Sequence, residues 1–342
     1  VSYLAIILLV TWEQKYLLAL GIGTVTEVVL NIWISWYVEQ KYPFLRQRRK
    51  EKSTSSLTKR IVRDLKSLFI SRISEKMLYC TDNLIISGFI GVGTVGRYAN
   101  YCMITQAISN ILTILANTIQ PTVGDYFTEK NRQRNYEILR QLTFGFFCIA
   151  SVVSVGLFSL ITPFVRDIWL GPSYELGWGI TVFCIVVLLV RIMGLPLSLV
   201  MGVTGLFEKE KNVGASSALL NLIVSLALVK PYGMAGVLLG TLLSYLLQIL
   251  YRYIIYFRDF LEMPGEALRY AQDIGEYLAV IAGEVLLMQK IVPLIYGAGG
   301  MLLFCVCFLL CIAIPLLLDL VIFGRGWRLQ SIVTMVKGMR KA

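Results

Sequence analysis

The feature that most constrains the fold of this chain is a series of apolar runs of about twenty residues. Short segments rich in lysine and arginine separate these runs. One such run is long enough to span a bilayer as a helix. Hydrophobic residues make up 57% of the chain and charged residues 15%, whereas soluble domains carry about a quarter charged residues. The runs are continuous and do not alternate with period two, which argues against a membrane barrel. We therefore predict an all-α, polytopic transmembrane helix bundle.

Ten apolar runs can be delimited by their polar borders. Residues 2–10 form a partial run, too short to cross a bilayer. The nine complete spans are predicted near Tyr16–Val38, Leu68–Ile90, Tyr98–Val123, Leu142–Val165, Leu176–Met201, Gly214–Val229, Gly236–Tyr256, Ile274–Val292 and Gly299–Phe323.

The basic residues give the orientation of these spans. Most of the 32 lysines and arginines lie in one set of alternate loops, and few lie in the other set. The positive-inside rule places the basic set in the cytoplasm, together with the C-terminus. This set comprises residues 39–67, 127–141, 206–213, 252–272 and 325–342. The net charge of +11 therefore indicates topology and anionic lipid headgroups, and not a nucleic-acid partner.

Histidine and cysteine usage excludes several kinds of chemistry. The chain has no histidine, which rules out a Ser-His-Asp triad and histidine-ligated zinc. Its seven cysteines lie inside apolar runs without CxxC spacing and are expected to be small buried side chains. We predict no metal site, no catalytic residues and no cofactor.

The second complete span carries a polar stripe. Within residues 68–90, ionisable and amide side chains share one helical face and apolar side chains occupy the other. Because a charge in hydrocarbon is unfavourable, this face should line a water-filled substrate pathway or a protein interface. The alternatives are headgroup pairing for the first three residues and interhelical hydrogen bonds for the last two. The candidate pathway residues are Arg72, Glu75, Lys76, Asp82 and Asn83.

The next span has a neutral polar stripe, in which amides and hydroxyls recur at helical spacing and offer both donors and acceptors for sugar hydroxyls. Helix–helix contacts are the alternative reading. The stripe consists of Gln106, Asn110, Thr113, Asn117 and Gln120. Two weaker polar stripes are also present. One consists of Glu27 and Asn31, and the other of Ser217, Asn221 and Ser225.

Arg191 is the one charged residue within the predicted span Leu176–Met201. It is expected either to pair with an acid such as Asp82 or Glu27 or to contact an anionic substrate. Asp82 and Glu27 are also the candidate coupling carboxylates for a proton or sodium ion. Pro163, Pro196 and Pro315 lie inside apolar runs, where each permits a kink.

Three segments resemble a known family. TDNLIISGFIGVGTVGRYANY (Thr81–Tyr101), FVRDIWLGPSY (Phe164–Tyr174) and ALLNLIVSLALVKPYGMAGVLLGTLLS (Ala218–Ser244) resemble signatures of bacterial polysaccharide flippases. These are the O-antigen and capsule type, or Wzx-like, members of the multidrug/oligosaccharidyl-lipid/polysaccharide exporter superfamily. Members often carry a basic residue directly before the proline of the tenth helix, whereas here Arg191 precedes Pro196 by about a turn.

The resemblance implies a two-lobed exporter with a central cavity. Residues 1–38 would then end the N-terminal lobe, residues 39–67 would form a basic cytoplasmic linker, residues 68–260 would form a C-terminal lobe of six helices, and residues 261–342 would add two helices and a basic tail. Because the chain begins with Val1 inside an apolar run, we expect that N-terminal helices of the first lobe are missing and that the chain is inactive alone.

The function implied by the resemblance is flipping of an undecaprenyl-diphosphate-linked oligosaccharide across the bacterial cytoplasmic membrane by alternating access. Its partners would be this lipid-linked substrate, the bilayer, a coupling proton or sodium ion, and polysaccharide assembly proteins. One alternative is a cation-coupled multidrug exporter of the same superfamily. Another is a polytopic polysaccharide polymerase or glycosyltransferase, which the short external loops disfavour, so we expect that the protein is not an enzyme.

Overall fold

A computed structural model describes residues 16–42, 55–127, 131–297 and 299–324, and every regular element in these ranges is helical. The elements are α2 (Tyr16–Lys41), α3 (Ser55–Phe89), α4 (Val92–Tyr126), α5 (Arg132–Pro163), η2 (Phe164–Trp169), η3 (Pro172–Tyr174), α6 (Trp178–Val203), α7 (Phe207–Tyr232), α8 (Met234–Ile254), η4 (Ile255–Leu261), α9 (Pro264–Tyr296) and α10 (Met301–Phe323). The predicted all-α class is confirmed.

Seven stretches within the described ranges, from α4 to α10, are long and apolar enough to cross a membrane. The predicted spans Tyr16–Val38 and Leu68–Ile90 are also helical, in α2 and α3, but they are not among these seven. Several helices continue beyond their apolar runs; α9, for example, begins ten residues before Ile274. Helical hydrogen bonding does not stop where the membrane ends, so hydropathy gives shorter limits than the backbone does.

The chain divides into two compact units, one up to Arg60 and one from Ile61 onward. The first unit contains α2, whose described side chains are largely exposed. The predicted linker 39–67 is helical at both ends, because α2 reaches Lys41 and α3 begins at Ser55; residues 43–54 lie outside the described part.

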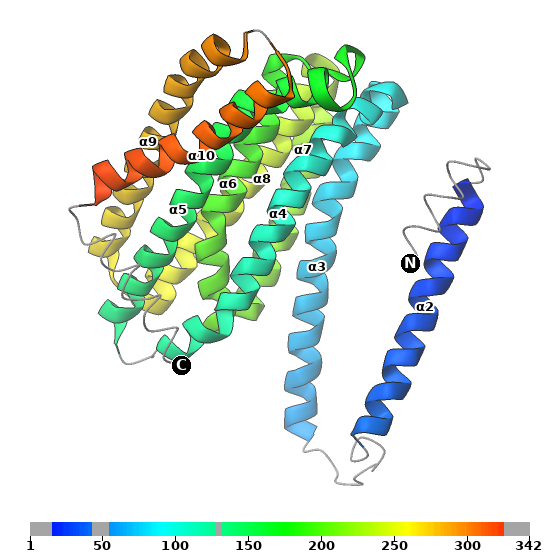
Figure 1. Ribbon diagram of the computed structural model, residues 1–342. Helices are drawn as coiled ribbons and strands as arrows, with labels where there is room; N and C mark the ends of the chain where they lie inside the picture. The colour runs from blue at the N-terminus through cyan, green and yellow to red at the C-terminus, as the bar shows by residue number, and fades with distance from the viewer. Residues whose placement is uncertain (1–15, 43–54, 128–130, 298, 325–342) are drawn as a thin grey trace. The chain divides into compact units, whose positions relative to one another are not determined.

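The second unit is built around α6, which packs against α4, α5 and α8 (Figure 1). Its buried side chains include Ile185, Ile192 and Leu197. The helix continues through Pro196, and α10 likewise continues through Pro315. Pro163 instead ends α5, and the wider π-turn η2 follows directly.

Helices α7 and α8 form the most extensive helix pair of the described chain. Gly233, with φ 57°, makes the turn between them. Gly236 and Gly240 then face α7 so closely that a Cβ atom on Gly236 would lie 2.3 Å from the backbone oxygen of Leu228. This small-xxx-small spacing lets two membrane helices approach at backbone distance.

Helices α5 and α9 run parallel, because three pairs of contacting residues keep a nearly constant sequence separation. Arg140 contacts Asp273, Ser151 contacts Glu284, and Asp167, just beyond α5, contacts Tyr296. Their parallel course agrees with the predicted alternation of spans, in which both helices start at the cytoplasmic side. Helix α10 packs against both of them (Figure 1).

The close approach of α7 and α8 gives a test of the fold. Replacing Gly236 with alanine should lower stability by about 1–3 kcal/mol, the usual cost of overpacking, since the backbone of Leu228 must move. Replacing Gly283 of α9, where an added Cβ meets nothing within 4 Å, is the matched control and should be neutral or slightly stabilising. The midpoint of thermal unfolding in detergent measures both, and equal midpoints for the two variants would contradict the packing described.

Candidate functional site

Asp82 of α3 lies in the interior of the second unit, where it is 5% exposed. Thr241 of α8 donates a hydrogen bond from Oγ1 to Asp82 Oδ2, at 2.7 Å. Asn221 of α7 donates from Nδ2 to Asp82 Oδ1 at 3.4 Å and to Thr241 Oγ1 at 2.9 Å. One carboxylate therefore joins three helices.

The surroundings of this carboxylate are polar but uncharged. Ser217, Ser225 and Ser244 are fully buried along the same α7–α8 seam, and Ser225 donates to the backbone oxygen of Val237, at 3.3 Å. In the described chain, the buried Asn221 Oδ1 has no hydrogen-bond partner. Neutral donors from Thr241 and Asn221 hold Asp82, and the cluster leaves the Oδ1 acceptor of Asn221 without a hydrogen bond.

The other polar residues of α3 do not join this cluster. Asn83 and Lys76 are exposed, and the side chains of Arg72 and Glu75 lie outside the part of the chain whose side chains the structure describes. The sequence allowed two roles for Asp82, either in a substrate pathway or in interhelical hydrogen bonds, and the structure shows the hydrogen bonds. Asn83 and Lys76 lie on the surface of the unit.

Helix α4 has three distinct faces. One face is buried and includes Leu112 and Ala116, and another is apolar and exposed and includes Ile111 and Ile114. The amide stripe lies between these two faces, with Gln106, Thr113 and Gln120 half-buried and Asn110 and Asn117 exposed.

Two contacts order this stripe. Gln106 donates from Nε2 to Asn110 Oδ1, at 3.3 Å. Gln120 lies over Gly202 of α6, where an added Cβ atom would come within 2.7 Å of the amide nitrogen. The stripe therefore presents a row of amides, still partly open, beside the packed interface with α6.

Arg191 is half-buried on α6. The hydrogen-bond partners of Asp82 are Thr241 and Asn221, and Arg191 is not one of them. Glu27 is exposed on α2, in the first unit, where Asn31 donates to its backbone oxygen at 2.9 Å. Within the described part of the second unit, the structure therefore brings Asp82 together with Asn221 of the weak α7 stripe and not with Arg191.

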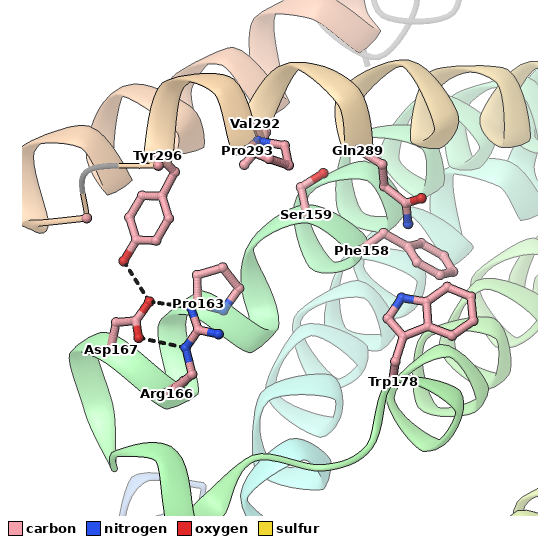
Figure 2. Close-up of a pocket in the computed structure, with 12 residues that line it drawn as sticks. Phe158, Ser159, Pro163, Arg166, Asp167, Trp178, Gln289, Val292, Pro293 and Tyr296 are labelled. Carbon is pink, nitrogen blue, oxygen red and sulfur yellow. Dashed lines mark hydrogen bonds and ion pairs between the residues drawn. The ribbon is translucent and has the colours of Figure 1, made fainter.

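A cavity of about 650 Å³, which the sequence did not indicate, lies between α5, η2, α6 and α9 (Figure 2). At one end, Arg166 makes a two-pronged ion pair with Asp167, at 2.8 and 3.1 Å, and Tyr296 donates to Asp167 at 3.1 Å. Gln289 and Trp178 line the other end. No local pattern could reveal this cavity, because it requires α9 to lie beside α5.

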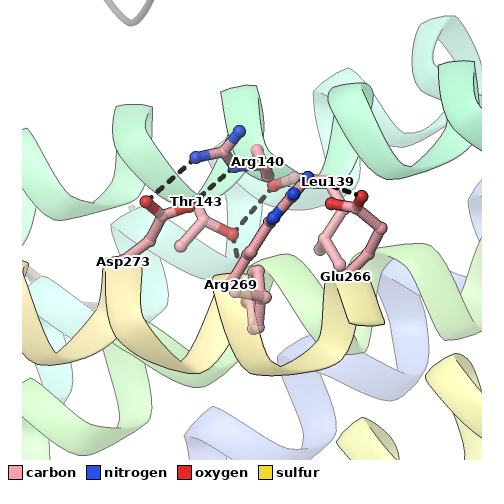
Figure 3. A network of polar contacts seen from close by, with 7 residues as sticks. Leu139, Arg140, Thr143, Glu266, Arg269 and Asp273 are labelled. Atoms are coloured by element: carbon pink, nitrogen blue, oxygen red, sulfur yellow. Dashed lines mark hydrogen bonds and ion pairs between the residues drawn. The ribbon is translucent and has the colours of Figure 1, made fainter. Parts of the chain in front are cut away.

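A second feature missed by the sequence analysis is an ion pair between α5 and α9 (Figure 3). Arg140 donates from Nε and Nη2 to the two carboxylate oxygens of Asp273, at 2.6 and 3.0 Å. Beside it, the hydroxyls of Thr143 and Tyr270 lie 3.1 Å apart. Hydropathy places Arg140 in a loop, so it gives no reason to pair the two residues.

The described residues contain no group of three or more cysteine, aspartate or glutamate side chains able to hold a metal ion. The polar groups of the Asp82 cluster and of the amide stripe are mainly neutral donors and acceptors of hydrogen bonds.

Comparison with known proteins gives one match. The model of a family described as "Polysaccharide biosynthesis protein" matches residues 1–127, a segment that contains Asp82 and the whole amide stripe of α4. No curated protein matches the chain. Together with the seven apolar helices, the match supports a multi-pass membrane protein related to polysaccharide biosynthesis.

The Asp82 cluster predicts a specific loss of stability. Replacing Thr241 with valine keeps the side-chain shape but removes the closest donor to a buried carboxylate, which should cost about 1–3 kcal/mol. Thr118→Val on α4 is the control, because this exposed hydroxyl bonds only to the backbone of its own helix, at 2.8 Å from the oxygen of Ile114. Unfolding in detergent should show a lower midpoint for Thr241→Val alone; an unchanged midpoint would mean that the hydrogen bond does not stabilise the fold.

Proposed function

We propose that this protein is an exporter of lipid-linked saccharides, which moves an undecaprenyl-diphosphate-linked oligosaccharide across the bacterial cytoplasmic membrane. The observation that carries the proposal is the amide stripe of α4, which stays partly open beside the packed α4–α6 interface. The match of residues 1–127 to a polysaccharide biosynthesis family supports it.

Amides suit this cargo for a physical reason. A membrane helix that leaves amides unburied must present them to protein, water or a polar ligand, because lipid tails offer no hydrogen bonds. Each amide has both donor and acceptor atoms, and sugar hydroxyls need both. The sugar head would pass along the stripe while the polyprenyl tail stays in the lipid.

The diphosphate needs cationic partners. Arg191, half-buried on α6, is the strongest candidate, since a guanidinium matches phosphate oxygens in a two-pronged geometry. Arg72 and Lys76 of α3 would add charge near the end that is predicted to be cytoplasmic. Alternating access, with the C-terminus in the cytoplasm, would carry the head from the inner to the outer leaflet, where polysaccharide assembly proteins would receive it.

A cation-coupled multidrug exporter is the second candidate, and the observation in its favour is the buried carboxylate of Asp82, a feature that could bind a cation. We propose a transporter rather than an enzyme, because the segment between α5 and α6 is short and largely taken up by η2 and η3. The amide stripe favours a saccharide over a lipophilic drug.

Replacing both Asn110 and Asn117 with alanine tests the proposal. Two lost hydrogen bonds of about 0.7 kcal/mol each correspond to a roughly tenfold fall in export. The control variant replaces Ile111 and Ile114, which are exposed on the neighbouring apolar face of the same helix, with alanine. Surface polysaccharide is measured in cells that lack their own exporter and express each variant in the full-length protein, at matched protein levels. Normal export by the amide variant would contradict the role of the stripe.

A further inference from the structure

Two carboxylates are buried where the fold provides them with few partners. Glu284 lies on α9 and is 3% exposed, and Asp319 lies on α10 and is 2% exposed. Both helices are candidate membrane spans. Asp319 is the one charged residue in the whole of α10, so nothing on its own helix can neutralise it.

Only one of the four carboxylate oxygens in this pair has a hydrogen-bond partner in the described chain. Ser151 of α5 donates from Oγ to Glu284 Oε2, at 2.5 Å. The other oxygen of Glu284 and both oxygens of Asp319 are buried without a hydrogen bond. Three acceptors therefore face a dry interior, which is unfavourable for a carboxylate and normally indicates a missing proton or ligand.

In the described part of the chain, the groups that interact with the pair are acidic or neutral. The two carboxylates are close enough to interact electrostatically with each other and with the thiol of Cys148 on α5. The helices that pack against α10 are α5 and α9, and they contribute Cys148, Ser151 and Glu284 to this place. Arg140, further along the same seam, is already held by both oxygens of Asp273.

We propose that Glu284 and Asp319 form a proton-binding site, in which the two carboxyl groups hold at least one proton at neutral pH. Two carboxylates that share a buried site cannot both be ionised at low cost, and one shared proton removes the repulsion. Divalent cations are poorer occupants, because calcium and magnesium take six or more oxygen ligands, and the described residues contain no group of three or more acids or cysteines that could hold a metal ion.

Aromatic packing lies on one side of the pair and the cavity lies toward the other. Phe323, one turn beyond Asp319, packs against Phe144, Phe147 and Tyr277 with ring centroids 5.5 to 5.8 Å apart. These aromatic rings fill the seam toward Arg140 and Asp273. In the other direction, Gln289 lines the 650 Å³ cavity, and at 1.5 Å per residue it lies about 7.5 Å along α9 from Glu284. Protons would reach the pair from the cavity.

A proton site in this position would let the entry of protons from outside drive export. This coupling rests on the proposed function. The binding of a proton by the pair is independent of the proposed function. The pair differs from Asp82, which has two neutral donors, and from Glu27, which is exposed. Spectroscopy without any saccharide can therefore test the site independently of transport.

The test is infrared titration of the purified protein, which follows the carbonyl stretch of protonated carboxyl groups from acid to alkaline pH. The wild-type protein should retain this band at neutral pH, and the double variant Glu284→Gln with Asp319→Asn, which removes both carboxyl groups, should lower its intensity. Glu276→Gln, the same change on an exposed position of α9, should leave it intact. Loss of the band in the wild-type protein at neutral pH, or an unchanged band in the double variant, would overturn the proposal.

A second measurement needs no variant and covers the case in which a substitution prevents folding. A hydrophobic carbodiimide reacts with protonated carboxyl groups in apolar surroundings, so mass spectrometry of the labelled wild-type protein should find the adduct on Glu284 or Asp319, with less labelling at alkaline pH. Protection by sodium chloride but not by choline chloride would assign the site to sodium and overturn the proton assignment, as would labelling confined to other residues.

Discussion

The cost of placing a polar side chain among apolar helices is the constraint on which this structure depends. Lipid tails offer no hydrogen bonds, so a buried donor or acceptor is stabilised by a partner on its own helix or on a neighbouring one. Two seams show the consequence. Asp82, Asn221 and Thr241 join α3, α7 and α8, and Ser151 with Glu284 joins α5 to α9.

Both seams depend on close helix packing. In the first, Gly236 and Gly240 bring α8 against the backbone of α7, which places Thr241 within reach of Asn221. In the second, the parallel course of α5 and α9 aligns an ion pair, an aromatic cluster and an acidic pair in order along one interface. Polar groups and packing therefore specify the same helix pairs.

Hydropathy and helical periodicity were sufficient to predict the helices, because both are local properties of the chain. They also identified Asp82 as a residue that must avoid lipid, and the structure places it in the interior. The partners of Asp82 were not predictable, since Asn221 and Thr241 lie far along the chain and only packing brings them to it. Glu284 and Asp319 were not predicted for a related reason: each is a single acid in an apolar run and belongs to no polar stripe with helical spacing.

The functional account assigns different tasks to the two parts of the second unit. The open amides of α4 would contact the sugar head, and the acidic pair between α9 and α10 would take up protons through the cavity beside Tyr296. The prediction of a coupling carboxylate at Asp82 or Glu27 stays untested. Asp82 already accepts two hydrogen bonds from neighbouring helices, so it has less need of a cation than Asp319, whose two oxygens have none.

The central claim is that the protein moves a lipid-linked saccharide between leaflets, and reconstitution tests it most directly. Vesicles would contain the full-length protein and a polyprenyl-diphosphate oligosaccharide with a fluorescent sugar head, and a membrane-impermeant quencher would be added outside. The account predicts that the protected inner-leaflet fluorescence is lost over time in vesicles with the protein and much more slowly with an Arg191→Ala variant. Protected fluorescence that stays as stable as in protein-free vesicles would contradict it.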